Sequence, residues 1–150
     1  MKHVWLLLGV FLAFVIQAKI SIFGIPPDIT VGLAYYLGLN SGATKGLLFG
    51  SFIGILEDSV TGTILGPNLL GKGMVGFCSS FLSGTLFRWT PLLGMVSLFL
   101  LTILDGVAVF LSRAIFETPP ATFSSGFFTI LMQGFLNAII GFMLRPKNVD

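Results

Sequence analysis

Long apolar runs, broken by glycine, proline and isolated charges, make up most of this chain. They predict six helical spans, at Val4 to Ala18, Ile29 to Leu39, Gly46 to Leu56, Leu69 to Phe87, Leu92 to Ser112 and Phe127 to Leu144. At about 1.5 Å per residue the second span covers only about 16 Å, so a kink or re-entrant segment over Phe23 to Pro27 is expected before it. The third span needs the polar residues at its ends, from Gly42 to about Ser59, to cross a bilayer.

Composition places these spans in a membrane. Of the 150 residues, 55% are hydrophobic and 9% are charged, against roughly 25% charged in an ordinary soluble domain, and the mean hydropathy is +1.00. The chain is therefore expected to form one all-α integral membrane domain over residues 1–150, a compact bundle of about six transmembrane helices. Its net charge of +2 comes from basic and acidic residues scattered singly, which leaves no patch for nucleic acid.

The distribution of positive charge predicts an orientation. With the N-terminus inside, the cytoplasmic side collects Lys2, Lys45, Arg88, Arg145 and Lys147, and the outer side collects Lys19, Arg113 and, arguably, Lys72. Because cytoplasmic loops carry an excess of Lys and Arg, both termini are expected in the cytoplasm. The first run is expected to be a retained helix, because Ile16-Gln17-Ala18 is a poor signal-cleavage site.

Four glycines at four-residue steps form a stripe that runs into two adjacent carboxylates. The stripe consists of Gly42, Gly46, Gly50 and Gly54, and the carboxylates are Glu57 and Asp58. A smooth glycine stripe lets a helix approach closely, either inside the bundle or from a second protein. Neighbours on a helix point about 100° apart, so one carboxylate is expected to face the bundle and the other water, and the spacing selects Asp58 as the inward one. Alternatively, both are hydrated loop residues.

Polar residues within the helices gather in one layer, the outer half of the bundle in this orientation. They are Asp28, Glu57, Asp58, Asn68, Lys72, Asp105, Gln133 and Asn137. One interpretation is an outward-facing polar cavity or a charged seam for a partner helix. The other is internal pairing, for example of Asp105 with Lys72 or Arg113, because an unpaired carboxylate at mid-depth is costly in a membrane.

Motifs for catalysis or metal binding are missing from the sequence. The single histidine is His3, the single cysteine is Cys78 in an apolar run, and there is no HExxH, CxxC, Walker loop or Ser/His/Asp set. An aspartate dyad of Asp58 and Asp105 lacks any flanking motif that would bring the two together. Neither an enzyme nor a bound metal or cofactor is expected.

Several motifs together resemble the MreD family of rod shape-determining proteins. They are Pro27-Asp28, then Gly46-x3-Gly50-x3-Gly54-Ile55-Leu56-Glu57-Asp58, then Thr61-Gly62, and then Leu65-Gly66-Pro67-Asn68-Leu69. The length and the six-span plan agree over the whole chain, and Glu57 stands where the family pattern has leucine.

The resemblance implies a non-enzymatic scaffold of the bacterial inner membrane, in the cell-elongation complex. Such a protein binds the transmembrane helix of MreC and helps to couple the MreB filament to RodA and a penicillin-binding protein during peptidoglycan synthesis. The implied fold is similar to the substrate-binding subunits of energy-coupling-factor vitamin transporters. A vitamin-binding subunit is therefore the alternative function, because those proteins also have six helices and an outward-facing pocket.

Overall fold

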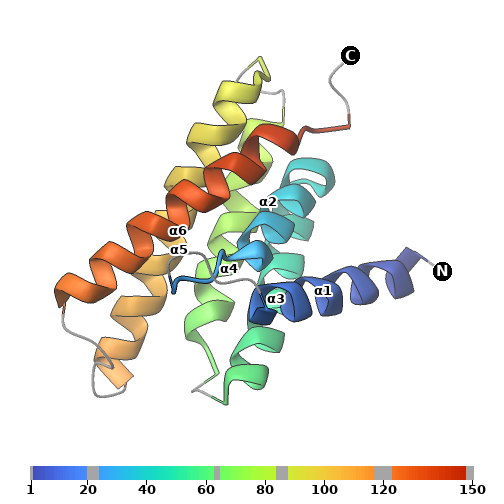
Figure 1. Cartoon of the computed structure of the whole chain (residues 1–150). Helices are drawn as coiled ribbons and strands as arrows, with labels where there is room; N and C mark the ends of the chain where they lie inside the picture. Colours follow the sequence, from blue (N-terminus) through green and yellow to red (C-terminus); the bar gives the residue numbers. More distant parts are fainter. Residues whose placement is uncertain (1, 20–23, 63–64, 84–87, 117–122, 148–150) are drawn as a thin grey trace.

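The computed structural model describes residues 2–19, 24–62, 65–83, 88–116 and 123–147 (Figure 1). Over these ranges the elements are α1 (Lys2–Lys19), α2 (Ile29–Ser41), α3 (Ala43–Thr61), α4 (Pro67–Ser79), a 3-10 turn η1 (Ser80–Leu82), α5 (Pro91–Phe116) and α6 (Phe123–Met143). None of the described residues forms a β-strand. The prediction of an all-helical chain with six helices is confirmed. Phe23 and the end of the predicted fourth span, at 84–87, lie outside the described residues.

The helix boundaries follow from local chemistry. Asp28 caps α2, since its carboxylate accepts a hydrogen bond from the backbone N–H of Val31 at 3.2 Å. Pro67 begins α4, a position where the missing N–H of proline costs nothing. Gly42 separates α2 from α3 with φ +84°, which glycine adopts without strain. Gly42 therefore belongs to a turn, and its inclusion in the helical stripe was wrong.

Helix α2 lies at the centre of the bundle and contacts each of the other five α-helices (Figure 1). On one side of it α3 and α4 form an antiparallel pair, and on another side α5 and α6 form a second pair. Helix α1 packs against α2 and runs across the long direction of the other helices. The inner face of α2 supplies Val31, Ala34, Tyr35 and Leu39 to the buried core.

Three glycines of the predicted stripe let α3 and α4 touch backbone to backbone. A Cβ added at Gly46 would collide with the carbonyl oxygen of Gly76, one at Gly50 with that of Lys72, and one at Gly54 with that of Asn68. Close approach of this kind is what small residues at helix interfaces permit. The stripe is therefore filled by α4 from the same chain, and a partner helix would have to displace α4 to use it.

Two described helices are long and apolar enough to cross a membrane, by length and composition: Pro91–Phe116 and Ser124–Met143. The 26 residues of α5 extend over about 39 Å, more than the roughly 30 Å of a bilayer's hydrocarbon core. Large apolar side chains are exposed along both helices, including Leu92, Leu100, Leu111, Phe127, Phe135, Ile139 and Phe142. Within the part of the chain that was searched, these are the two predicted spans that meet the criterion, and the multi-pass arrangement stays a prediction.

Candidate functional site

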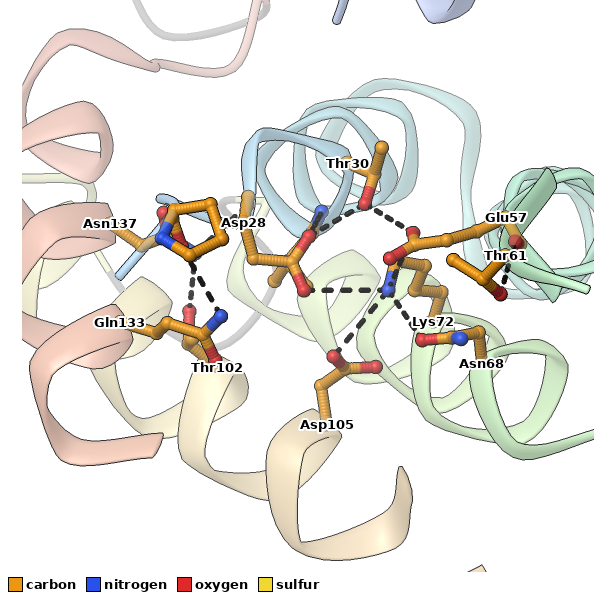
Figure 2. Close-up of polar contacts among 12 residues, drawn as sticks. Asp28, Thr30, Glu57, Thr61, Asn68, Lys72, Thr102, Asp105, Gln133 and Asn137 are labelled. Atoms are coloured by element: carbon orange, nitrogen blue, oxygen red, sulfur yellow. Dashed lines mark hydrogen bonds and ion pairs between the residues drawn. The ribbon is translucent and has the colours of Figure 1, made fainter. Parts of the chain in front are cut away.

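A fully buried lysine lies at the centre of the polar layer. Lys72 Nζ lies 2.9 Å from Glu57 Oε2, 3.5 Å from Asp28 Oδ2 and 3.6 Å from Asp105 Oδ2. It also donates to Asn68 Oδ1 at 3.1 Å, one helical turn earlier on α4. Figure 2 shows the four partners converging on the ammonium. We call Lys72 and its three carboxylate partners, Asp28, Glu57 and Asp105, the ion cluster. It joins α3, α4 and α5 to the start of α2.

A threonine hydroxyl connects two of the carboxylates. Thr30 Oγ1 lies 2.6 Å from Asp28 Oδ1 and 2.7 Å from Glu57 Oε2 (Figure 2). Thr30 lies close to Asp28 because Asp28 caps α2 and Thr30 is in the first turn of that helix. Each carboxylate that faces α2 thus has a neutral partner as well as the ammonium, which reduces the cost of burial.

Glu57 and Asp58 are both buried, at 9% and 0% exposed, and they have different partners. Glu57 enters the ion cluster, whereas Asp58 turns to the N-terminus of α4. There it accepts hydrogen bonds from Gly66 N at 2.9 Å, Asn68 N at 3.3 Å, Leu69 N at 3.3 Å and Asn68 Nδ2 at 2.8 Å. The expectation that one of the pair faces water was wrong, and so was the choice of Asp58 alone as the inward one.

We expect Asp58→Ala to lower the free energy of unfolding by about 1–2 kcal/mol, because α4 loses the acceptor for its first N–H groups. Asp58→Asn keeps one acceptor oxygen and is expected to lose less. The matched control is Ser59→Ala, which removes an exposed hydroxyl bonded to the Ile55 carbonyl within the same helix. Equilibrium unfolding in detergent micelles, followed by helical circular dichroism, measures the difference, and equal values for Asp58→Ala and Ser59→Ala would contradict the capping role.

The two amides of α6 share a helix face and tie that helix to the chain before α2. Asn137 Nδ2 donates to the Asp28 carbonyl at 2.9 Å and lies 3.1 Å from Thr102 Oγ1. Gln133 Nε2 donates to the Pro26 carbonyl at 3.2 Å. Asn137 is fully buried and acts as an internal link, while Gln133 also borders a cavity.

A cavity of about 340 Å³ adjoins the ion cluster. Five residues predicted for a polar cavity line it: Asp28, Glu57, Asn68, Asp105 and Gln133. Asp58, Lys72 and Asn137 do not line it and are held in internal contacts. The remaining lining comes from Gln17 on α1, from Thr61, from Gly106, Val109, Phe110 and Arg113 on α5, and from Ser125, Gly126, Thr129 and Ile130 on α6.

Sequence reasoning missed Thr30 and Gln17. Thr30 could have been found from the Asp-x-Thr spacing at a helix start, where short polar side chains commonly cap. Gln17 is the single amide of α1, and no motif in the sequence marks it as a site residue. Among the described His, Cys, Asp and Glu residues, no group of three is arranged to hold a metal ion. In the ion cluster, the lysine ammonium stands between the carboxylates.

Over the described residues, these features define an all-helical bundle with a buried ion cluster beside a cavity of mixed polar and apolar lining. Comparison of the chain with protein-family models, with curated proteins and with solved structures gives no match.

Proposed function

We propose that the protein is a multi-pass inner-membrane scaffold of the bacterial cell-elongation complex, similar to MreD, which binds MreC. Both termini face the cytoplasm, and the cavity opens toward the outer side. Through MreC the scaffold acts on MreB, RodA and a penicillin-binding protein to organise peptidoglycan synthesis.

The membrane location is supported by the exterior of the bundle. Apolar side chains are exposed along α5 and α6, and α3 and α4 expose Leu48, Phe52, Leu70 and Met74 on their outer faces. A water-soluble domain rarely exposes apolar surface on this scale, whereas lipid covers it at no cost. The charged groups of the ion cluster are instead turned inward, as expected for ionisable residues at membrane depth.

The scaffold role is supported chiefly by one observation: the motif residues make contacts between helices. Asp28 and Glu57 bind Lys72, Asp58 caps α4 at Gly66 and Asn68, and Gly50 and Gly54 set the α3–α4 contact. Asp28, Asp58, Gly50, Gly54, Gly66 and Asn68 belong to the motifs that carry the resemblance, whereas Glu57 departs from the family pattern. All of them hold helices together in this fold. A rigid bundle of this kind presents a constant outer surface, which is what a partner-binding scaffold requires.

MreC is expected to dock on the outer apolar surface, since α4 fills the glycine stripe. Photo-crosslinking side chains at Phe52 on α3, Met74 on α4, Leu100 on α5 and Phe135 on α6 sample four exposed faces. A crosslink to MreC from one of these faces identifies the docking surface. Crosslinking from Tyr35, which is buried, serves as the negative control.

Co-purification tests the proposal directly. The tagged protein, extracted in mild detergent, is expected to retain MreC as identified by mass spectrometry, and depletion of the protein is expected to turn rods into rounded cells. Absence of MreC from every preparation, or rods that keep their shape after depletion, would overturn the scaffold role.

The cavity favours one second candidate, the substrate-binding subunit of an energy-coupling-factor vitamin transporter. Its volume of about 340 Å³ lies within the range of small-molecule sites. Uptake of radiolabelled vitamins that falls in a deletion strain, together with an adjacent ATPase cassette in the genome, would favour this function. Unchanged uptake would remove it.

A further inference from the structure

Two carboxyl groups from different parts of the fold meet at one hydroxyl group. The Thr30 hydroxyl oxygen lies within 2.6 Å of Asp28 Oδ1, before α2, and 2.7 Å of Glu57 Oε2, near the end of α3 (Figure 2). Both distances are those of short O–H···O hydrogen bonds. A hydroxyl group has one hydrogen to donate and otherwise accepts. Thr30 therefore donates to one carboxylate, and the second contact is a full hydrogen bond only if the other carboxyl group supplies the hydrogen.

The other donors around the two carboxyl groups do not replace that hydrogen. The Lys72 ammonium has three N–H groups for four acceptors, which include Glu57 Oε2 at 2.9 Å and Asp28 Oδ2 at 3.5 Å. The Val31 N–H donates to Asp28 Oδ1 at 3.2 Å. Neither donor changes the count at Thr30, where one hydrogen serves two contacts. The contact between Asp28, Thr30 and Glu57 is thus one hydrogen short.

The charge of the ion cluster also favours an added proton. Three carboxylates face one ammonium, so negative charge is in excess inside the bundle if all three are ionised. Uncompensated charge is costly to bury, and like charges in one site repel each other. One proton on Asp28 or Glu57 removes one of these charges and supplies the hydrogen that the contact at Thr30 lacks.

Charged groups on the neighbouring helices are fixed in number. Lys72 on α4 and Asp105 on α5 face the two carboxyl groups within the ion cluster, and Arg113 on α5 lines the adjoining cavity. Asp58, next to Glu57, is turned to the N-terminus of α4. The described residues of α1 and α6 that line the cavity carry no charge. Because lysine and arginine side chains keep their protons at neutral pH, the carboxyl groups are the members of this set that exchange one.

We propose that Asp28 and Glu57 share one proton through Thr30, and that exchange of this proton with the cavity makes the contact between α2 and α3 sensitive to pH. The side chains of Asp28 and Glu57 are each 11% exposed and line the cavity, so water reaches them there. Loss of the proton leaves two ionised carboxylates at one hydroxyl group, and their repulsion weakens the contact between the start of α2 and the end of α3. The inference does not depend on the scaffold role, because it is measured on the isolated protein.

Infrared spectroscopy of the full chain in detergent micelles detects the proton directly, because a protonated carboxyl group has a C=O stretching band that ionised carboxylates lack. At about pH 7, where carboxyl groups in water are ionised, we expect such a band. It is expected to shift in heavy water, since the cavity admits solvent, and to disappear as the pH is raised. Absence of the band at this pH would overturn the proposal without any variant, and a band that heavy water does not shift would contradict exchange through the cavity.

Variants assign the band to the named residues. Asp28→Asn and Glu57→Gln each leave no second carboxyl group to share the proton, so each is expected to abolish the band. Thr30→Val removes the hydroxyl at nearly constant shape and is expected to move the loss of the band about one pH unit lower, the effect of one hydrogen bond, whereas Thr30→Ser is expected to restore it. Glu117→Gln, the same change at the other glutamate of the chain, is the control and is expected to keep the band. A band retained in full by both Asp28→Asn and Glu57→Gln would overturn the sharing.

Stability against pH is the second readout. Carboxyl groups of the unfolded chain titrate at about pH 4, so at neutral pH the folded chain holds one proton that the unfolded chain has released. Stability therefore falls as the pH rises, and the equilibrium constant for unfolding is expected to increase about tenfold per pH unit until the folded chain loses the proton. Glu57→Gln is expected to lose this dependence, whereas Glu117→Gln is expected to keep it. The same dependence in Glu57→Gln as in the unaltered protein would overturn the pH-sensitive contact.

Discussion

Replacing Lys72 by methionine is expected to lower the free energy of unfolding by about 3–5 kcal/mol, the cost of removing one partner of a buried ion pair. Lys72 is fully buried and is the ammonium shared by Asp28, Glu57 and Asp105. Methionine fills a similar volume, so the loss reports the charge more than the packing. Equilibrium unfolding in mixed detergent micelles measures the change, and the yield of monodisperse protein gives a second readout.

The control for Lys72→Met is Lys45→Met, which removes an exposed lysine and is expected to change the free energy of unfolding by less than about 0.5 kcal/mol. A double variant makes the test specific. Lys72→Met with Glu57→Gln removes one buried carboxylate along with the ammonium and is expected to recover part of the loss. If Lys72→Met unfolds like the Lys45 control, the ion cluster contributes nothing to the fold.

Gly50→Ala is expected to lower the free energy of unfolding by about 1–3 kcal/mol, the usual range for overpacking a close contact. The added methyl group would meet the carbonyl of Lys72 and the Cα of Gly73, which are backbone atoms and cannot rotate away. Gly50→Leu is expected to prevent accumulation of folded protein. Fluorescence-detected size exclusion measures the amount that accumulates, and unfolding in micelles measures the alanine variant.

Gly9→Ala is the matched control for the glycine substitution. Gly9 is also within a helix, but a Cβ added there meets no atom within 4 Å. Alanine is the better helix former by about 1 kcal/mol, so this variant is expected to be neutral or slightly stabilised. Equal destabilisation of Gly9→Ala and Gly50→Ala would show that close packing of α3 on α4 is not what Gly50 provides.

The positions of the six helices were predictable because apolar runs and their glycine, proline and charged interruptions are local signals. The predicted start of the second helix at Ile29 matches α2, since Pro26-Pro27-Asp28 stops one segment and caps the next. The stripe at Gly46, Gly50 and Gly54 predicted a close helix contact, but not with which helix. The spacing of the glycines shows that they share one face of a helix, but it does not identify the helix that packs on that face.

The candidate site was predicted as a set of residues and not as an arrangement. Asp28, Glu57, Asn68, Lys72 and Asp105 do converge, because the start of α2, the end of α3 and the first half of α4 meet the middle of α5. The sequence did not predict that Glu57 would bind Lys72 while Asp58 would cap α4. It depends on how α3 and α4 pack, which places Asp58 against Gly66 and Asn68 and places Glu57 against Lys72.

By itself the sequence determined the helical class, the number of helices and the layer in which polar residues gather, since composition and local spacing suffice for these. The tertiary structure decided that Lys72 joins three carboxylates, that α4 fills the glycine stripe and that a cavity adjoins the ion cluster. Each of these depends on how helices far apart in the chain rotate and pack against one another. Pairwise contacts of that kind are set by the whole bundle, and no single segment encodes them.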